Sequence, residues 1–395
     1  MSATSQTQRW GAVLAMSLAA FALVASEFMP VSLLTPLAAD LHITEGQAGQ
    51  GISVSGVFAL LTSLVIASIA ARVDRKRLLM ALTLLMIVSG SVVAFAPNYL
   101  VFMLGRALIG VAIGGFWSLS AATAMRLVPQ AQVPRALAIV NGGNALATVI
   151  AAPLGSFLGG IIGWRGAFFC VVPVAVIALV WLLVSLPALK NKAEAKAGNV
   201  LSLMKNPTVA LGMVAVSVFF MGQFMLFTYL RPFLESVTRV DVSTLSLMLL
   251  VLGLAGLAGT FLIERFLKHH LYPTLIAIPL IMAGIALALV AFGSSTLMTS
   301  VLLGSWGLVA TAAPVGWWTW LSRTTPDNAE AGGGLMVAII QLAIAAGATV
   351  GGVAFDLSGY QATFELSAAL LVVATVLAYL ASRRPRPARV ISSAS

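Results

Sequence analysis

Charged residues are scarce in this chain. Its 395 residues include only 22 Lys and Arg and 12 Asp and Glu, whereas 60% of the residues are hydrophobic. A soluble domain carries charge on about 25% of its residues, so this chain lacks the polar surface that a water-soluble globule needs. The composition therefore excludes a soluble protein and indicates that the solvent is a lipid bilayer.

Cysteine and histidine are also nearly missing. Cys170 is the single cysteine, which excludes an internal disulfide, and the three histidines are too scattered to form a zinc site (His42, His269 and His270). The net charge of +10 does not form a basic polar face, because Lys and Arg fall in short breaks between apolar runs. We therefore expect no metal, no cofactor and no nucleic-acid partner.

Long apolar runs dominate what is present. A bilayer core about 30 Å thick needs about 20 apolar residues per helix, and these runs lack the alternation of barrel strands. The first run follows Arg9, is longer than the core of a signal peptide and has no small-residue cleavage site, so it predicts a span. The sequence thus predicts an all-α integral membrane protein with twelve spans, at about 11–36, 47–70, 78–96, 99–124, 135–161, 166–186, 208–233, 242–263, 272–292, 295–320, 331–355 and 361–381.

The basic residues predict the orientation, because Lys and Arg in short loops stay on the cytoplasmic side. With both termini in the cytoplasm of a bacterial inner membrane, only Arg165, Arg231 and Arg239 lie outside, and Arg106 falls within the fourth span. The other 18 lie inside: Arg9, Arg72, Arg75, Lys76, Arg77, Arg126, Arg135, Lys190, Lys192, Lys196, Lys205, Arg265, Lys268, Arg323, Arg383, Arg384, Arg386 and Arg389.

The longest polar break divides the spans into two sets of six. We expect an N-terminal half at 1–187, a cytoplasmic linker at 188–206 and a C-terminal half with a basic tail at 207–395. The halves look alike: Pro129 precedes Gly155 by 26 residues, and Pro326 precedes Gly352 by 26. Duplicated halves of this kind are typical of transporters with a substrate site between the repeats.

Two ionisable residues lie deep within predicted spans. Glu27 is 17 residues past Trp10, about 25 Å along the first helix, and Arg106 is about 10 Å inside the fourth. Because a charge in hydrocarbon costs about 2.5–3.5 kcal/mol on insertion scales, such residues are functional candidates. We expect Glu27 to exchange a proton for a substrate, assisted by Arg106. The alternative is a buried ion pair that only holds two helices together.

Aromatic and amide side chains are the candidates for substrate binding. The seventh span carries Phe220, Gln223, Phe224 and Phe227 on one helical face, and an amide facing lipid would be unsatisfied. Rings facing lipid or packed in the core are the alternative for each aromatic residue. Flat rings with amides suit a flat, hydrogen-bonding solute better than an ion. The remaining candidates are Trp117, Asn141, Asn144, Trp318 and Gln341.

Small residues form a stripe on the fifth span. Gly155, Gly159 and Gly163 recur every four residues, just after Pro153, a residue that kinks or loosens a helix. Static close packing and a contact that slides during transport explain this stripe equally well.

The whole chain resembles the major facilitator superfamily, and within it the twelve-span bacterial drug and metabolite proton antiporters. The loop ARVDRKRLLM resembles the basic loop between spans two and three of that family, which implies a conformational role for Arg72, Asp74, Arg75 and Lys76, although Ala71 and Asp74 depart from the usual aspartate and glycine. Arg106 with Gly110 resembles the fourth-span pattern. Pro153, Gly155 and Gly159 resemble the fifth-span antiporter pattern, which implies a gating role.

Several blocks resemble more narrowly the bacterial purine ribonucleoside efflux permeases, with sugar efflux permeases next: SEFMPVSLLTPLAADL, GGFWSLSAATAMRLVP, AAPLGSFLGGIIGWR, FTYLRP and PVGWWTWL. This resemblance implies export of inosine- and guanosine-like solutes and purine analogues in exchange for protons, by a monomer in the bilayer. Sugar or multidrug efflux by proton antiport is the alternative. A membrane enzyme or a channel is disfavoured, because neither a catalytic constellation nor a selectivity ring is visible.

Overall fold

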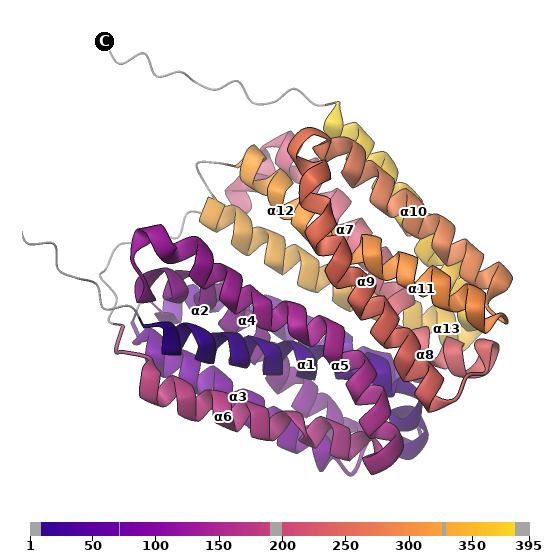
Figure 1. Ribbon diagram of the computed structural model, residues 1–395, viewed down its shortest axis with the longest axis horizontal. Coiled ribbons are helices and arrows are strands. Elements are labelled where there is room, and N and C mark those ends of the chain that lie inside the picture. Colours follow the sequence, from indigo (N-terminus) through magenta and orange to yellow (C-terminus); the bar gives the residue numbers. More distant parts are fainter. Residues whose placement is uncertain (1–8, 71, 190–199, 326–328, 384–395) are drawn as a thin grey trace, which may run out of the picture.

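The computed structural model describes residues 9–70, 72–189, 200–325 and 329–383, and these are almost entirely helical (Figure 1). Short helical turns η1 (Gln130–Gln132), η2 (Val200–Lys205) and η3 (Leu234–Thr238) join longer helices. The longer helices are α1 (Trp10–Leu41), α2 (Glu45–Ala70), α3 (Arg75–Ala94), α4 (Tyr99–Leu127), α5 (Val133–Phe169), α6 (Val171–Ser185), α7 (Pro207–Thr228), α8 (Leu230–Phe233), α9 (Val242–His269), α10 (Leu271–Phe292), α11 (Thr296–Ala310), α12 (Ala313–Thr324) and α13 (Ala329–Ser382).

The chain is a multi-pass membrane protein. Within the described ranges, 10 helical stretches are long and apolar enough to cross a bilayer. Two of them, Gln130–Ser185 and Gly332–Ser382, span 56 and 51 residues, which is far more than one crossing of about 20 residues requires. Each breaks at a glycine with positive φ, Gly163 at 75° and Gly359 at 77°. Two crossings in each of these stretches accommodate the twelve predicted spans.

The glycine breaks correct one prediction about the fifth span. Gly163 does not extend the small-residue stripe, because its left-handed backbone ends the helix before the next crossing begins. The predicted tenth span is likewise split into α11 and α12, and the seventh continues past Thr228 through the single turn of α8.

Polar side chains cap the helices where apolar runs begin. The Asn98 side chain accepts a hydrogen bond from the backbone N–H of Val101 at 3.0 Å, which starts α4, and Asn206 does the same for Thr208 at 2.9 Å, which starts α7. At the start of α9, the backbone N–H of Thr244 donates to Asp241, and hydrogen bonds from Thr244, its side chain first and its backbone second, hold the pKa of the Asp241 carboxyl below its usual value.

The helices form two groups, each with its own apolar core. The first group is α1–α6 and the second is α7–α13. Ala19, Ile113 and Leu182 are buried in the first group, and Phe219, Trp306 and Phe364 in the second. The predicted domain limits stay a prediction, and residues 190–199 of the linker, Pro326 and the tail from residue 384 lie outside the described residues.

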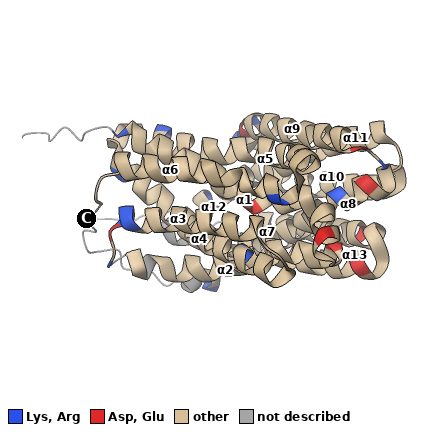
Figure 2. Ribbon diagram, turned by 90° about the horizontal axis from the view of Figure 1, so that it is seen from below, with Lys and Arg blue, Asp and Glu red and all other residues tan. Residues whose placement is uncertain are grey.

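The two groups meet mainly towards one end of the bundle. We call the end where α1 begins and α13 finishes the terminal end, and the other the opposite end. α5 packs on α9 and α2 packs on α13, and Figure 1 shows the groups diverging from this contact towards the terminal end. In Figure 2, Lys and Arg gather towards the terminal end and most Asp and Glu towards the opposite end.

Candidate functional site

Arg106 of α4 lies fully buried at the centre of the first group. Its Nη1 donates to the carbonyl oxygen of Ser26 at 2.8 Å, and its Nη2 to that of Glu27 at 2.9 Å. Its Nε donates to the Gly51 carbonyl oxygen at 3.0 Å, and Nη2 also reaches Ser55 Oγ at 3.2 Å. The guanidinium therefore fastens α1, α2 and α4 together through neutral acceptors.

A proline explains why one of these carbonyl groups is free to accept. Pro30 lies inside α1 and has no N–H, so it removes the helical hydrogen bond to the carbonyl of residue 26. An unpaired backbone carbonyl within a membrane protein is costly, and Arg106 supplies the missing donor to Ser26.

Glu27 of α1 is buried between the two helix groups. Its Oε1 accepts a hydrogen bond from Nε2 of Gln341 on α13 at 3.3 Å, so the carboxyl group is linked across the groups. Among the described residues, the ion pairs are Arg165–Asp40 and Arg231–Glu235. In this conformation Arg106 bonds to the backbone of Glu27 and forms no ion pair with its carboxyl group, and the role of both residues in proton exchange stays a prediction.

Aromatic rings line the boundary between the groups beside α1. Phe28, which is not among the predicted site residues, stacks on Phe224 of α7 with ring centroids 5.6 Å apart and planes inclined by 26°. Phe227 meets Phe224 edge to face at 5.9 Å. Trp117 is half buried and packs beside α1 against the small cluster that contains Val24 and Ala25. Rings from both groups therefore meet at Phe28, the residue that follows Glu27 in α1.

The other two candidates on α7 differ in their surroundings. Phe220 is buried in the core of the second group and packs edge to face on Phe219, at 5.3 Å. The Gln223 Oε1 atom is buried and has no hydrogen-bond partner within the described residues. This carboxamide oxygen is therefore available to accept a hydrogen bond from a donor group on a solute.

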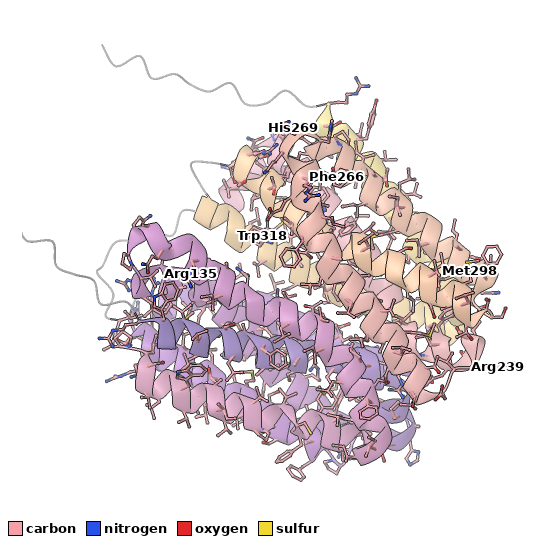
Figure 3. The ribbon with its side chains drawn as sticks, in the orientation of Figure 1. Arg135, Arg239, Phe266, His269, Met298 and Trp318 are labelled. Carbon is pink, nitrogen blue, oxygen red and sulfur yellow. The ribbon has the colours of Figure 1, made fainter. Side chains whose placement is uncertain are left out.

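Three candidates are not brought into this cluster. Asn141 is exposed and donates to the carbonyl oxygen of Leu137 one turn earlier in α5, at 2.9 Å. Asn144 is half buried one turn further along the same helix. Trp318 is 42% exposed and is labelled in Figure 3 on the side of the second group that faces the first, near Gly333.

The fifth-span stripe contacts α1 rather than the second group. A Cβ atom at Gly155 would lie 2.6 Å from Ser32 Oγ, and one at Gly159 would meet the Leu33 side chain. Pro153 frees the carbonyl of Val149, and Gly253 of α9 approaches that carbonyl so closely that a Cβ would lie 2.8 Å from its oxygen. Close packing of α5 on both neighbours depends on these small residues.

The basic loop at the terminal end holds helix ends together. Asp74 caps α3 by accepting from the N–H of Lys76 at 2.8 Å, and Lys76 Nζ donates to the Leu183 carbonyl oxygen near the end of α6 at 2.8 Å. Arg72 is exposed in the turn before this cap, and Arg75 is the first residue of α3.

Substitutions of Asp74 distinguish a role in capping helix α3 from a role of its negative charge in gating. Asp74→Ala is expected to lower the free energy of unfolding by about 1 kcal/mol, because the α3 terminus loses its acceptor. Asp74→Asn keeps a capping oxygen and is the matched control, with melting close to that of the parent. Thermal melting of the purified protein checks both. Lost transport in the Asn variant with unchanged melting would instead assign Asp74 a role through its charge.

Further contacts between the groups were missed from the sequence. Asp356 of α13 accepts from Thr44 Oγ1 at 2.6 Å and from the Gly46 N–H at 3.0 Å, at the start of α2. Ser53 donates to the Ala345 carbonyl oxygen at 2.9 Å. These hydrogen bonds lie between Glu27 and the opposite end. The described residues contain no group of three or more His, Cys, Asp or Glu that could hold a metal.

The fold and the site define a membrane transporter built from two helix groups. The model of the Major Facilitator Superfamily matches residues 16–347, and the chain belongs to this superfamily. A Pseudomonas aeruginosa protein named transcription regulatory protein OpdE is 60% identical over 387 residues, covering 97% of this chain and 96% of the relative. The purine ribonucleoside efflux pump NepI of Salmonella paratyphi B is 42% identical over 378 residues, covering 96% and 95%.

Solved structures share the fold at low identity. A bacterial homologue of the human lysosomal transporter Spinster, in an inward-facing and unoccupied conformation, has a TM-score of 0.76 and 17% identity, with 97% and 98% of the two chains covered. The nucleoside transporter NupG has a TM-score of 0.78 and 13% identity, with 94% and 98% covered.

Proposed function

We propose that this protein exports purine ribonucleosides such as inosine and guanosine, and related purine analogues, in exchange for protons. The observation that carries the proposal is the Glu27 carboxyl group, buried between the two helix groups and hydrogen-bonded across them by Gln341. The 42% identity with a purine ribonucleoside efflux pump over nearly the whole chain supports the choice of substrate.

The orientation completes this proposal. We place the terminal end, where the basic residues gather in Figure 2, in the cytoplasm of a bacterial inner membrane. The hydrogen bonds between the groups lie between Glu27 and the opposite end, so with this orientation we infer that a solute reaches the site from the cytoplasm. A monomer suffices for transport, since both helix groups belong to one chain. Its partners are the solute, protons and the lipid bilayer, and no covalent chemistry is required.

We propose that proton exchange arises because solute binding at the boundary between the groups competes with protonation of Glu27. A solute that enters from the cytoplasm loosens the contacts around Glu27, and the carboxyl group releases its proton inwards. After the groups rock and the opposite end opens, the solute leaves and Glu27 takes up a proton from outside. Each cycle thus moves one solute out against one protonation event at Glu27.

A purine ribonucleoside matches the side chains at this boundary. Its flat ring suits the faces of Phe28 and Phe224, and its ring edges and hydroxyl groups suit the free oxygen of Gln223 and the amide of Gln341. The solute needs no net charge. Buried polar groups left unpaired by an analogue make discrimination sharp against missing polar atoms.

Transport by inverted membrane vesicles tests the substrate. Vesicles energised with a proton gradient are expected to accumulate labelled inosine or guanosine, with competition from unlabelled purine nucleosides and none from arabinose. Analogues that lack a ring or ribose polar group should compete at least about tenfold more weakly, which corresponds to one lost hydrogen bond of about 1.4 kcal/mol.

Other outcomes would replace the substrate but not the fold. Accumulation of a pentose without competition from inosine would favour sugar efflux, and accumulation of unrelated drugs would favour multidrug efflux. The name of the Pseudomonas relative refers to transcription. For this chain we propose that any effect on transcription follows from the exported solute, so a Glu27→Gln variant, which no longer exports solute against a gradient, should lose that effect as well.

A further inference from the structure

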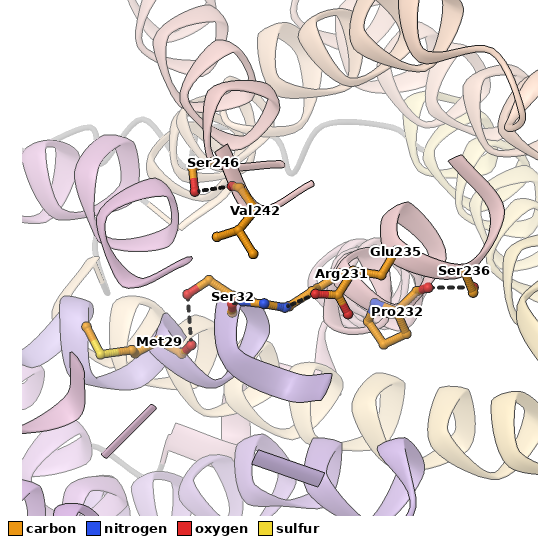
Figure 4. A network of polar contacts seen from close by, with 8 residues as sticks. All are labelled: Met29, Ser32, Arg231, Pro232, Glu235, Ser236, Val242 and Ser246. Atoms are coloured by element: carbon orange, nitrogen blue, oxygen red, sulfur yellow. Dashed lines mark hydrogen bonds and ion pairs between the residues drawn. The ribbon is translucent and has the colours of Figure 1, made fainter. Parts of the chain in front are cut away.

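Arg231 is a second buried arginine that reaches α1. It lies on α8, directly after the break that ends α7 at Thr228, and is only 4% exposed. Its Nε donates to Glu235 Oε1 at 2.8 Å, and its Nη1 donates to the carbonyl oxygen of Ser32. Figure 4 shows this guanidinium between Glu235 of its own group and Ser32 of the first group.

A proline again explains why the carbonyl group is available. Pro36 lies inside α1 four residues after Ser32 and has no N–H, so the helix leaves the Ser32 carbonyl without its usual donor. The stretch of α1 around Glu27 therefore carries two freed carbonyls. Arg106 of the first group pairs the one at Ser26, and Arg231 of the second group pairs the one at Ser32.

The two arginines differ in what happens when the groups move. Arg106 and Ser26 belong to the same group, so rocking leaves their bond intact. The bond from Arg231 to Ser32 crosses the groups and exists only while α8 lies against α1. When the opposite end opens, Arg231 keeps Glu235 as a partner, whereas the Ser32 carbonyl loses its donor.

We propose that Arg231 is a positioning residue that ties the second helix group to the Glu27 segment of α1 through the carbonyl that Pro36 frees. The closed opposite end is stabilised by this bond, and the same bond fixes the α1 segment that presents Glu27 to Gln341. This inference rests on the proposed function for its role in transport, but the contact itself is tested without substrate.

Cysteine labelling of purified protein measures opening of the opposite end. Ile52 of α2 is 1% exposed and packs with residues of the second group, so Ile52→Cys in a Cys170→Ser background reports separation of the groups. Arg231→Gln is expected to raise the rate of maleimide labelling about tenfold, as expected for losing a hydrogen bond from a charged donor. Pro36→Ala restores an N–H that competes for Ser32 and should raise the rate as well.

Three further variants make the test specific. Pro30→Ala makes the same substitution in α1, but the N–H that it restores competes for the Ser26 carbonyl, which Arg106 bonds within the first group, so it should raise the labelling rate less than Pro36→Ala does. In the Arg231→Gln background, Pro36→Ala should add nothing, because both changes act on one bond. Arg231→Lys retains a donor, so its labelling rate should lie between that of the parent and that of Arg231→Gln.

Equal effects of Pro30→Ala and Pro36→Ala, or additive effects of Pro36→Ala and Arg231→Gln, would overturn the inference. Unchanged labelling in Arg231→Gln would overturn it too. None of these outcomes involves a solute or a proton gradient, so each would leave the proposed transport function to be decided by the vesicle experiment.

Discussion

Glu27→Gln is expected to abolish proton-driven accumulation while exchange of solute for solute continues. The glutamine keeps the size of the side chain and an oxygen that accepts from Gln341, so the link across the groups at 3.3 Å persists. It cannot take up or release a proton. Because a carrier without a coupled ion only equilibrates its solute, the accumulation ratio in energised vesicles should fall to about 1.

The control for this experiment is a carboxyl group elsewhere in the membrane domain. Glu365 of α13 is exposed, and Glu365→Gln should accumulate solute as the parent does. Glu27→Ala should also impair exchange, because it removes the acceptor for Gln341. Undiminished uphill transport by the Gln variant would show that another group carries the proton.

Arg106→Lys is expected to impair transport almost as severely as Arg106→Ala. Arginine donates from Nε, Nη1 and Nη2 to acceptors on two helices, α1 and α2, whereas lysine offers one nitrogen that cannot reach the carbonyl oxygens of Gly51 and Ser26 together. An unpaired buried carbonyl costs about 1–3 kcal/mol, and each 1.4 kcal/mol is a factor of about 10. The initial rate of transport should therefore fall at least about tenfold in both variants. Thermal melting is measured in parallel.

Arg323 provides the matched control for the lysine substitution. Its Nη2 donates to a single carbonyl oxygen, that of Leu267, at 3.1 Å, which one lysine nitrogen can replace. Arg323→Lys should transport and melt close to the parent. Normal transport by Arg106→Lys would reduce Arg106 to a positive charge without a geometric role.

The spans could be predicted because hydrocarbon imposes a length and a composition on every crossing. The superfamily is confirmed, and the predicted boundary between spans five and six agrees with the break at Gly163. The breaks at Thr311 and after Thr228 carry a signal that the predicted spans did not use, since Pro314 and Pro232 have no N–H for the carbonyls of Ala310 and Thr228, each four residues earlier. A proline also occurs inside a continuous helix, as Pro30 does in α1, so whether the helix ends there depends on packing against neighbouring helices.

The candidate site was only partly predictable. Depth in the bilayer selects Glu27 and Arg106, but it does not tell whether an arginine meets a carboxylate or a backbone carbonyl. The signal for the second choice is present in the sequence, since Pro30 and Pro36 mark the carbonyls of Ser26 and Ser32. The sequence does not reveal which arginine reaches each carbonyl, or that Phe28 stacks on Phe224. Both depend on contacts between segments that are distant in the sequence.

The stack of Phe28 on Phe224 has a consequence for selectivity. Each ring already has a partner, so a flat solute that binds there, as we propose, must separate the two rings and lose their attraction, which is about 0.5–1.5 kcal/mol. A molecule that offers only an aromatic face merely replaces one ring by another and gains little. A molecule that also bonds the neighbouring amides gains more than it displaces. The Phe28–Phe224 stack thus competes with the solute for the ring faces. This competition disfavours apolar aromatic compounds and favours transport of aromatic compounds that also form hydrogen bonds.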